Sequence, residues 1–182
     1  CSGLTGFIIP DAVTSIGENA FSGCTSLTTI TIPENVISMA GVEFANCTNL
    51  TSATILGKPS SLAGTFSGCS KLEQANIPES VVTMKTTFYG CTNLKSVSIP
   101  KSVTSIGSGS TYSLSGCYNL TKIEVEEGNT VFDSREDCNA LIKTSSNELL
   151  SGCRNTVIPA TVQSISSQAF YNVKGLREIT IP

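Results

Sequence analysis

Apolar residues recur along this chain with a period far longer than that of one helix or one strand. Six cysteines mark the period, and each stands three residues before a leucine. They are Cys1, Cys24, Cys47, Cys69, Cys91 and Cys117, followed by Leu4, Leu27, Leu50, Leu72, Leu94 and Leu120. The successive steps are 23, 23, 22, 22 and 26 residues. A nearly constant period of this length predicts stacked structural repeats rather than one wound core.

Two further apolar positions keep the same period. One is filled by Phe21, Phe44, Phe66, Phe88 and Phe170, with Leu114 in the lengthened repeat. The other is filled by Ile16, Met39, Leu62, Met84, Ile106 and Ile165. One repeat is too small to bury these side chains by itself, so each coil must close against its neighbours. The sequence therefore predicts a solenoid in which equivalent side chains form ladders.

Each repeat contains a short alternating stretch, as in Leu27, Ile30 and Ile32 with polar residues between them. Alternation with threonine and β-branched side chains predicts a strand, and stacked coils would pair such strands in parallel. The residue directly before each repeated cysteine is of a type that tolerates a positive φ, and a residue with a positive φ commonly ends a helical turn. These are Gly23, Gly68, Gly90 and Gly116, with Asn46 and Asn172 in the same position. We therefore expect a short helical or 3-10 segment over residues such as 18–22, on the outer face.

The period is broken between about residues 126 and 159. Glu126 stands where a proline is expected, and the next proline in register comes 33 residues later. The run 139–150 predicts two short antiparallel strands around a turn of two serines. In the simplest register Lys143 faces Glu148, Leu141 faces Leu150 and Cys138 faces Cys153. We expect this hairpin to be an irregular long repeat within the stack rather than a second domain.

The eight cysteines allow two interpretations. An even number in an exported chain is compatible with a disulfide framework. Six of them, however, share one position of the repeat, ahead of a leucine expected to be buried, where a small apolar core residue belongs. Free, buried thiols are therefore expected for these six. A disulfide between Cys138 and Cys153 stays open, because the hairpin register brings only this pair together.

Several positions of one repeat together follow the pattern Ile-Pro-x-x-Val-x-x-Ile-x-x-x-Ala-Phe-x-x-Cys-x-x-Leu. It is almost intact over residues 9–27 and returns over 158–176 with valine for cysteine. This pattern resembles the BspA-like leucine-rich repeats of bacterial cell-surface proteins. The resemblance implies a leucine-rich-repeat solenoid, with short parallel strands forming one continuous sheet on the concave face and short helical or 3-10 turns and loops on the convex face. It covers nearly the whole chain, so residues 1–182 are expected to form a single leucine-rich-repeat domain.

Composition indicates an extracellular surface rich in uncharged polar groups. Only 14% of the residues are charged and the net charge is −3, so a clustered basic face for nucleic acid is not expected. The sequence has no apolar run of about twenty residues, so no membrane span is predicted. The chain opens at the cysteine of one repeat and closes at the end of another. We therefore expect a fragment of a longer extracellular or cell-surface protein, whose export signal and anchor lie outside this sequence.

The absence of histidine limits the chemistry of the chain. Ser/His and Cys/His nucleophile relays and histidine-containing zinc sites are excluded, and no Cys-x-x-Cys pair suggests a thiolate zinc site. Acidic residues gather between positions 124 and 137, where they could hold calcium. Their spacing matches no calcium loop, so a solvated acidic edge is the simpler interpretation. We expect no enzyme activity, no metal and no cofactor.

The remaining candidate is the exposed side of the predicted sheet, from which polar residues of each strand point outward. The predicted binding residues are Thr29, Thr31, Thr51, Thr54, Glu73, Asn76, Lys95, Ser98, Lys122 and Glu124. This face offers many hydrogen-bonding groups but few aromatic or arginine anchors, so modest affinity with avidity from many copies is expected. The leading hypothesis is a surface adhesion or recognition module for an extracellular protein or glycan. The alternative is a passive spacer or stalk that presents other domains.

Overall fold

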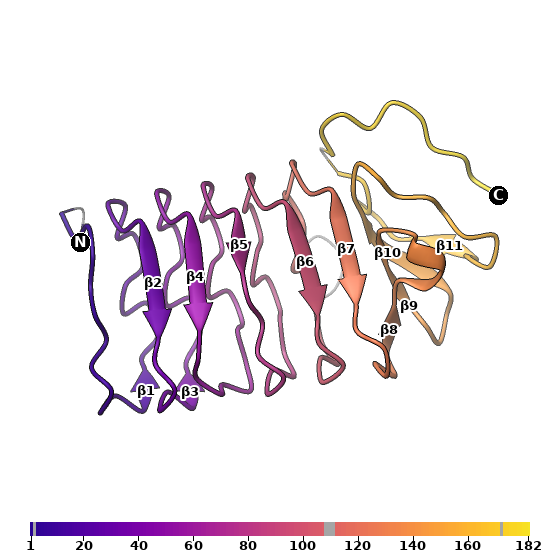
Figure 1. The fold of residues 1–182 in the computed structure, drawn as a ribbon. Helices are drawn as coiled ribbons and strands as arrows, with labels where there is room; N and C mark the ends of the chain where they lie inside the picture. Colours follow the sequence, from indigo (N-terminus) through magenta and orange to yellow (C-terminus); the bar gives the residue numbers. More distant parts are fainter. Residues whose placement is uncertain (2, 108–111, 172) are drawn as a thin grey trace.

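The computed structural model describes residues 1, 3–107, 112–171 and 173–182, so Asn172 lies outside the described residues. Its coils lie side by side in a row (Figure 1). Each coil runs along one strand and returns through an irregular segment behind it, and we call these two faces the strand side and the return side. The strands of the strand side are β2 (Thr29–Ile32), β4 (Ser52–Ile55), β5 (Gln74–Ala75), β6 (Ser96–Ile99) and β7 (Lys122–Val125). The predicted solenoid is confirmed.

Parallel pairing sets the step from coil to coil. Thr29 lies beside Ser52, and Ser52 beside Gln74, so equivalent positions of successive repeats meet. Strands β6 and β7 pair in the same way. A second, shorter ladder joins β1 (Ser15–Ile16) to β3 (Ser38–Met39) where the coils turn back. Pairing of the backbone between equivalent residues explains why the sequence keeps its period so closely.

The strand side is not the single continuous sheet that the sequence predicts. Its ladders are β2-β4-β5 and β6-β7, joined by a hydrogen bond from the Lys95 N–H to the Glu73 carbonyl at 3.3 Å. Strand β5 ends at Ala75 because the next residue, Asn76, bonds the preceding coil through its side chain instead of its backbone. The Asn76 side chain accepts from the Ile55 N–H at 2.7 Å and donates to the Ile55 carbonyl at 2.8 Å.

The core consists of ladders that run along the rod. The rings of Phe21 and Phe44 stack with centroids 5.2 Å apart, and Phe66 continues the stack to Phe88 at 6.0 Å. Buried thiols form a second ladder, in which each cysteine donates to the carbonyl oxygen of a phenylalanine in the preceding coil at 3.1–3.2 Å. The donors are Cys47, Cys69, Cys91 and Cys117, and the acceptors are Phe21, Phe44, Phe66 and Phe88. The predicted ladders of free, buried thiols and of aromatic rings are both present, and only Cys1 of the six cysteines is exposed. Phe170, which was expected in the aromatic ladder, packs instead against a separate small core that contains Cys138.

The return side contains turns where helical segments were expected over residues such as 18–22. The Ser22 N–H bonds the Asn19 carbonyl at 3.0 Å, but the Phe21 N–H bonds Glu43 of the next coil at 2.9 Å. Backbone donors are thus used between coils and cannot build a continuous helix. The positive φ expected before the cysteine position is found, for example 68° at Gly23 and 59° at Asn46. Among the described residues, the only assigned helix is a 3-10 turn, Arg135–Asp137.

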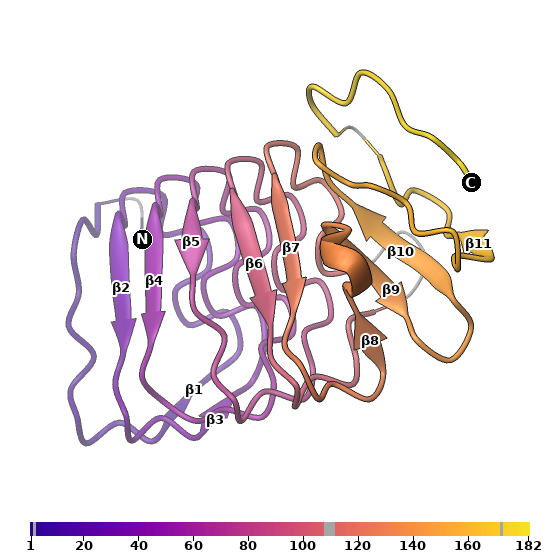
Figure 2. The same ribbon diagram turned by 45° about the vertical axis from the view of Figure 1, so that its right-hand side comes forward.

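The irregular repeat forms the orange part of the molecule, next to β7 (Figure 2). Its sheet has the order β11-β10-β9-β8, made of β8 (Phe132–Asp133), β9 (Ala140–Lys143), β10 (Glu148–Gly152) and β11 (Ser164–Ile165). The predicted hairpin is present as β9 and β10, with Lys143 opposite Glu148. Strand β8 adds a further antiparallel partner that the sequence did not reveal.

A β-bulge in β10 keeps Cys138 and Cys153 apart. The register shifts after Leu149, so that Leu141 faces Ser151 instead of Leu150. An inserted residue moves the following side chains relative to the partner strand. Cys138 accordingly packs in a small core with Leu149, whereas Cys153 packs in the main core. Both thiols are free, so the disulfide left open by the sequence is not formed in this structure.

Candidate functional site

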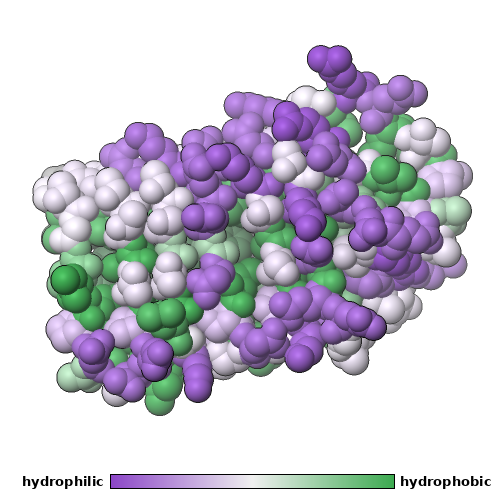
Figure 3. All heavy atoms as spheres, viewed as in Figure 1, coloured by the Kyte–Doolittle hydropathy of each residue, from purple (hydrophilic) through white to green (hydrophobic). Residues whose placement is uncertain are grey.

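The strand side presents the predicted residues to solvent. In β2 the exposed Thr29 and Thr31 alternate with the buried Ile30 and Ile32, and the pattern returns in β6. All ten predicted residues are exposed: Thr29, Thr31, Thr51, Thr54, Glu73, Asn76, Lys95, Ser98, Lys122 and Glu124. Figure 3 shows this face, with weakly hydrophilic groups over β2 and β4 and strongly hydrophilic groups farther along. The structure therefore places these residues on one surface, and whether they bind anything stays a prediction.

The charges of the strand side are paired locally. Lys95 lies 2.6 Å from Glu73 of the preceding coil, and Lys122 lies 2.9 Å from Glu124 on its own strand. The side chains of all four residues are about half exposed, between 48% and 63%. Exposed ion pairs of this kind contribute about 0–1 kcal/mol to folding. These side chains can therefore exchange their partners for a ligand at small cost to the fold.

Some polar groups of this surface also join the coils. The hydroxyl of Thr51 donates to the Thr28 carbonyl at 3.0 Å, and Thr121 bonds Lys95 of its neighbouring coil in the same way. Asn76, one of the predicted binding residues, bonds both backbone groups of Ile55. These contacts give Thr51 and Asn76 a structural role that the sequence did not reveal.

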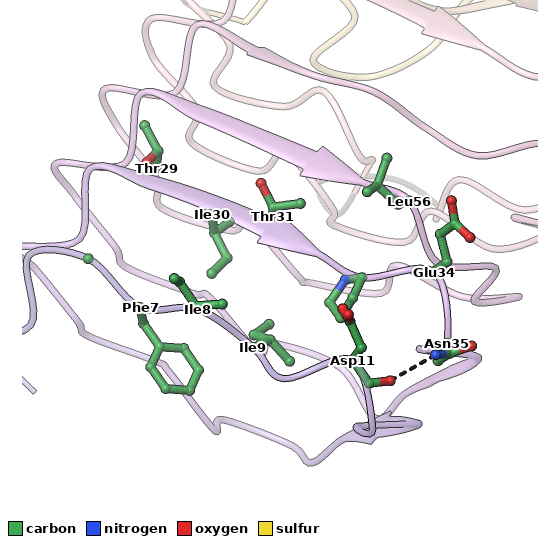
Figure 4. Close-up of a pocket in the computed structure, with 12 residues that line it drawn as sticks. Phe7, Ile8, Ile9, Asp11, Thr29, Ile30, Thr31, Glu34, Asn35 and Leu56 are labelled. Atoms are coloured by element: carbon green, nitrogen blue, oxygen red, sulfur yellow. Dashed lines mark hydrogen bonds between the residues drawn. The ribbon is translucent and has the colours of Figure 1, made fainter.

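A groove of about 1100 Å³ lies beside β2 (Figure 4). The predicted residues Thr29 and Thr31 line it together with Ile8 and Leu56. Ile8 is 88% exposed and Leu56 49% exposed, which is unusual for side chains of their size. The groove thus adds apolar contact area next to the hydroxyls of β2.

A second pocket, of about 470 Å³, lies on the return side. Its walls include Tyr89, Tyr118 and Tyr171, which come from three different repeats. Sequence reasoning missed this pocket because it followed the residues that agree between repeats. The available signal was the opposite one, namely tyrosine at positions that elsewhere hold small residues.

The acidic stretch 124–137 contains one well-built ion pair. Asp133 accepts two hydrogen bonds from the Arg135 guanidinium, at 2.6 and 2.7 Å, and one from the Thr144 hydroxyl at 2.9 Å. Burial raises the pKa of Asp133, but these hydrogen bonds outweigh burial and hold the pKa below its ordinary value. Arg135 also donates to Asn147, so the cluster ties β8 to the hairpin turn. In the described part of the chain, no group of three or more histidine, cysteine or acidic residues is placed to hold a metal ion.

Two other kinds of potentially reactive group, a buried carboxylate and the buried thiols, have structural roles. Glu43 is fully buried, and its carboxylate accepts from the Gly41 N–H at 2.5 Å and from the Thr65 hydroxyl at 2.9 Å. Burial raises the pKa of the Cys117 thiol to about 12 and that of Cys91 well above its ordinary value. Thiols with raised pKa values are poor nucleophiles at neutral pH because the reactive form is the thiolate. These cysteines are therefore packing groups.

The part of the chain that the structure describes contains no helix long and apolar enough to cross a membrane.

Comparison with known proteins agrees with this geometry. The model of a family described as BspA type leucine rich repeat region matches residues 1–110 and 142–182 in six copies. Among solved structures, a leucine rich cell surface protein from Faecalibacterium prausnitzii is 27% identical with a TM-score of 0.67, over 94% of this chain and 59% of that one. A leucine-rich repeat protein from Bacteroides ovatus is 32% identical with a TM-score of 0.52, over 62% of this chain and 35% of that one.

The chain spans about three fifths of the Faecalibacterium protein and less of the other. A leucine-rich repeat protein from Eubacterium ventriosum shares the fold at 24% identity and a TM-score of 0.62, over 86% of this chain and 48% of that one. No curated protein matches the chain.

Proposed function

Because the chain belongs to the BspA-type leucine-rich repeat family, we propose that it is a non-enzymatic adhesion or recognition module that binds an extracellular protein or glycan through its strand side. The observation that carries this proposal is the exposure of all ten predicted residues on one surface. The coils stack through ladders of inward-facing side chains, and the outward positions vary in charge without disturbing the stack. An extended surface with such variation suits recognition of a large partner.

The groove beside β2 and the charged region around β6 and β7 would contribute differently. Ile8 and Leu56 offer apolar area that a partner can bury, which is the usual source of binding energy. Lys95, Glu73 and Lys122 offer charges that fix orientation and register. The likeness to a protein named as a leucine rich cell surface protein supports placing this chain at the cell surface or outside the cell.

A screen of the purified chain against extracellular-matrix proteins and a glycan array would supply the partner. The triple variant Glu73→Ala, Lys95→Ala and Lys122→Ala should then weaken binding by about tenfold or more, because interface charges are lost. Its melting temperature should stay within a few degrees of the parent chain, since the charges are exposed.

The chain offers a matched control for this variant. Glu79 and Lys101 form an equally exposed pair at 4.0 Å beyond the ends of the strands, and Lys58 is exposed in the corresponding turn of an earlier coil. Replacing these three by alanine makes the same change in net charge away from the strand side. Equal loss of binding in both variants, or no loss in the first, would show that the strand side is not the binding face.

The spacer hypothesis is favoured by the hydroxyls that bond neighbouring coils, such as that of Thr51. A spacer would give no hit in the screen, and its replacement by an unrelated rod of equal length would preserve function in the cell. An adhesion module would lose attachment of the cell to its partner after the same replacement. This experiment separates the two functions even while the ligand is unidentified.

A further inference from the structure

Three tyrosines depart from the rule that the repeats otherwise follow. The position after the aromatic ladder holds small residues in most coils, namely Ser22, Ala45, Ser67 and Ser115, but Tyr89 and Tyr171 in two others. The position after the cysteine ladder holds Thr25, Thr48, Ser70 and Thr92, but Tyr118 in the lengthened repeat. Coils with small residues at these positions stack through the same backbone hydrogen bonds, so the fold does not require these rings. Tyrosine rings that the fold does not require suggest a function for these side chains.

The three departures converge on one place. Tyr89, Tyr118 and Tyr171 all line the return-side pocket of about 470 Å³. Tyr89 and Tyr171 are 47% and 53% exposed, so their rings are available to a ligand. Each of these two closes the same kind of turn, since the Tyr89 N–H bonds Thr86 at 3.2 Å and the Tyr171 N–H bonds Gln168 at 2.9 Å.

The irregular repeat makes this convergence possible. It supplies the hairpin β9–β10 between the coil of Tyr118 and the coil of Tyr171. The two return segments nevertheless meet directly, because the Lys174 N–H bonds the Tyr118 carbonyl at 3.0 Å. Tyrosines that are 53 residues apart in the chain, at positions 118 and 171, thereby line one pocket.

The rest of the lining is uncharged, and apart from Val42 it consists of small or polar residues. Gly90 and Gly116 expose backbone, and the Gly116 Cα region is so close to Gly90 that an added Cβ would lie 3.2 Å from it. Thr86, Ser115 and Gln168 add hydroxyl and amide groups that both donate and accept hydrogen bonds. None of the described residues that line the pocket is charged. Lys174 is the nearby cation, with its Nζ 6.0 Å from the centre of the Tyr118 ring.

We infer that this pocket is a binding site for a neutral carbohydrate. Sugar rings carry C–H groups on their faces and hydroxyls around their edges. Aromatic rings have negative faces that attract such C–H groups, and the amide and hydroxyl side chains can bond the edges. The volume falls in the range of about 300–1,000 Å³ that small-ligand sites occupy.

The lining argues against other ligand classes. A nucleotide or acidic sugar would need cations for its charge, and the lining residues provide none. A protein segment would gain most from an apolar groove, whereas Val42 is the only aliphatic side chain among the described lining residues. Rings combined with neutral polar groups match a sugar better than either.

Binding of a sugar in this pocket can be measured by tyrosine fluorescence. The chain has no tryptophan and four tyrosines, three of which line the pocket, so tyrosine emission reports directly on it. We expect saturable changes in emission with some member of a panel of neutral cello-, chito-, manno- and galacto-oligosaccharides. Tyr89→Ser and Tyr171→Ser introduce the residue that other repeats carry, so both variants should fold. Each should weaken binding by about tenfold or more, and calorimetry should detect no binding by the double variant.

Two controls make the outcome decisive. Tyr112→Phe, outside the pocket lining, removes only a hydroxyl that accepts from Ser166 at 3.4 Å and should bind as the parent chain does. The strand-side triple variant should also bind the sugar normally, so failure of the proposed function and failure of this inference are distinguishable. The inference is overturned if no neutral sugar binds, if only acidic sugars bind, or if the double variant binds unchanged. It is also overturned if a protein partner, and no sugar, depends on Tyr89 and Tyr171.

Discussion

Replacement of Phe66 by alanine should remove more stability than any change of equal size outside the aromatic ladder. Phe66 is 0% exposed, and its ring stacks on Phe44 and Phe88 with centroid distances of 6.0 Å on both sides. Truncation of a buried phenylalanine costs about 3–5 kcal/mol, and each aromatic contact adds about 0.5–1.5 kcal/mol beyond burial. Two lost contacts place the expected cost near the upper end, at about 4–5 kcal/mol.

The ladder itself provides the matched control. Leu114 fills the same position in the lengthened repeat, so Phe66→Leu keeps a side chain that this position accepts. It loses the ring contacts but most of the burial remains, and we expect a cost of about 1–2 kcal/mol. Phe7→Ala removes a ring that is 39% exposed and tilted against Phe21 at 5.1 Å, and should cost less than Phe66→Ala.

Urea unfolding followed by circular dichroism measures these differences. With a slope of about 2 kcal/mol per molar urea, a cost of about 4 kcal/mol lowers the midpoint by about 2 M. Because each coil contacts only its neighbours, the alanine variant should also lose cooperativity, seen as a smaller slope. A midpoint for Phe66→Ala equal to that of Phe66→Leu would refute the reasoning, because the lost burial would then cost nothing beyond the ring contacts. A midpoint equal to that of Phe7→Ala would refute it as well, because a fully buried ring in the stack would then contribute no more than a partly exposed one.

The remaining predictions concern pH and thiol chemistry. Burial raises the pKa of Cys117 to about 12 from an ordinary value of 9.0, so between these values the folded state keeps a proton that the unfolded state loses. The free energy of unfolding should therefore fall as the pH rises through this interval. Cys117→Ala should reduce this dependence of the free energy of unfolding on pH. In native protein a thiol reagent should modify Cys1 rapidly and the seven buried thiols slowly, whereas in denaturant all eight should react; six reactive thiols would indicate a disulfide that the structure lacks. Asp133 has a lowered pKa in the folded protein because its hydrogen bonds to Arg135 and Thr144 outweigh burial. Its charged form therefore stabilises the fold at pH values above 3.8, its ordinary pKa, and this contribution disappears as the pH falls through the lowered pKa of the folded state. Asp133→Asn should remove that acid-side dependence, and an unchanged pH profile by calorimetry would contradict the assignment.

The ladders and the outward positions could be predicted because they repeat. A residue such as Phe44 or Thr31 has counterparts in other coils, so its inward or outward direction follows from many positions at once. The positive φ at Gly23 and Asn46 followed in the same way from glycine and asparagine sharing one position. Repetition makes the prediction for each single residue secure.

The features that could not be predicted depend on single residues or on contacts between coils. No local pattern marks Leu149 as the place where the hairpin register shifts, and this shift separates Cys138 from Cys153. The turns at 18–22 replace helices because the Phe21 N–H bonds the next coil, which composition does not reveal. The pocket of Tyr89 escaped attention because it arises from departures from the repeat.

The central claim is that successive coils lie side by side, so that distance along the rod follows the number of coils. Spin labels at Thr31 and Ser98, or at Thr31 and Glu124, would test it in a chain with Cys1 replaced by serine. These outward positions are three and four coils apart, and strands are spaced by about 4.8 Å, which predicts backbone separations of about 14 Å and 19 Å. A distance that grows by one strand spacing from the first pair to the second would support the stack. Equal distances for the two pairs, or a shorter distance for the second, would contradict it.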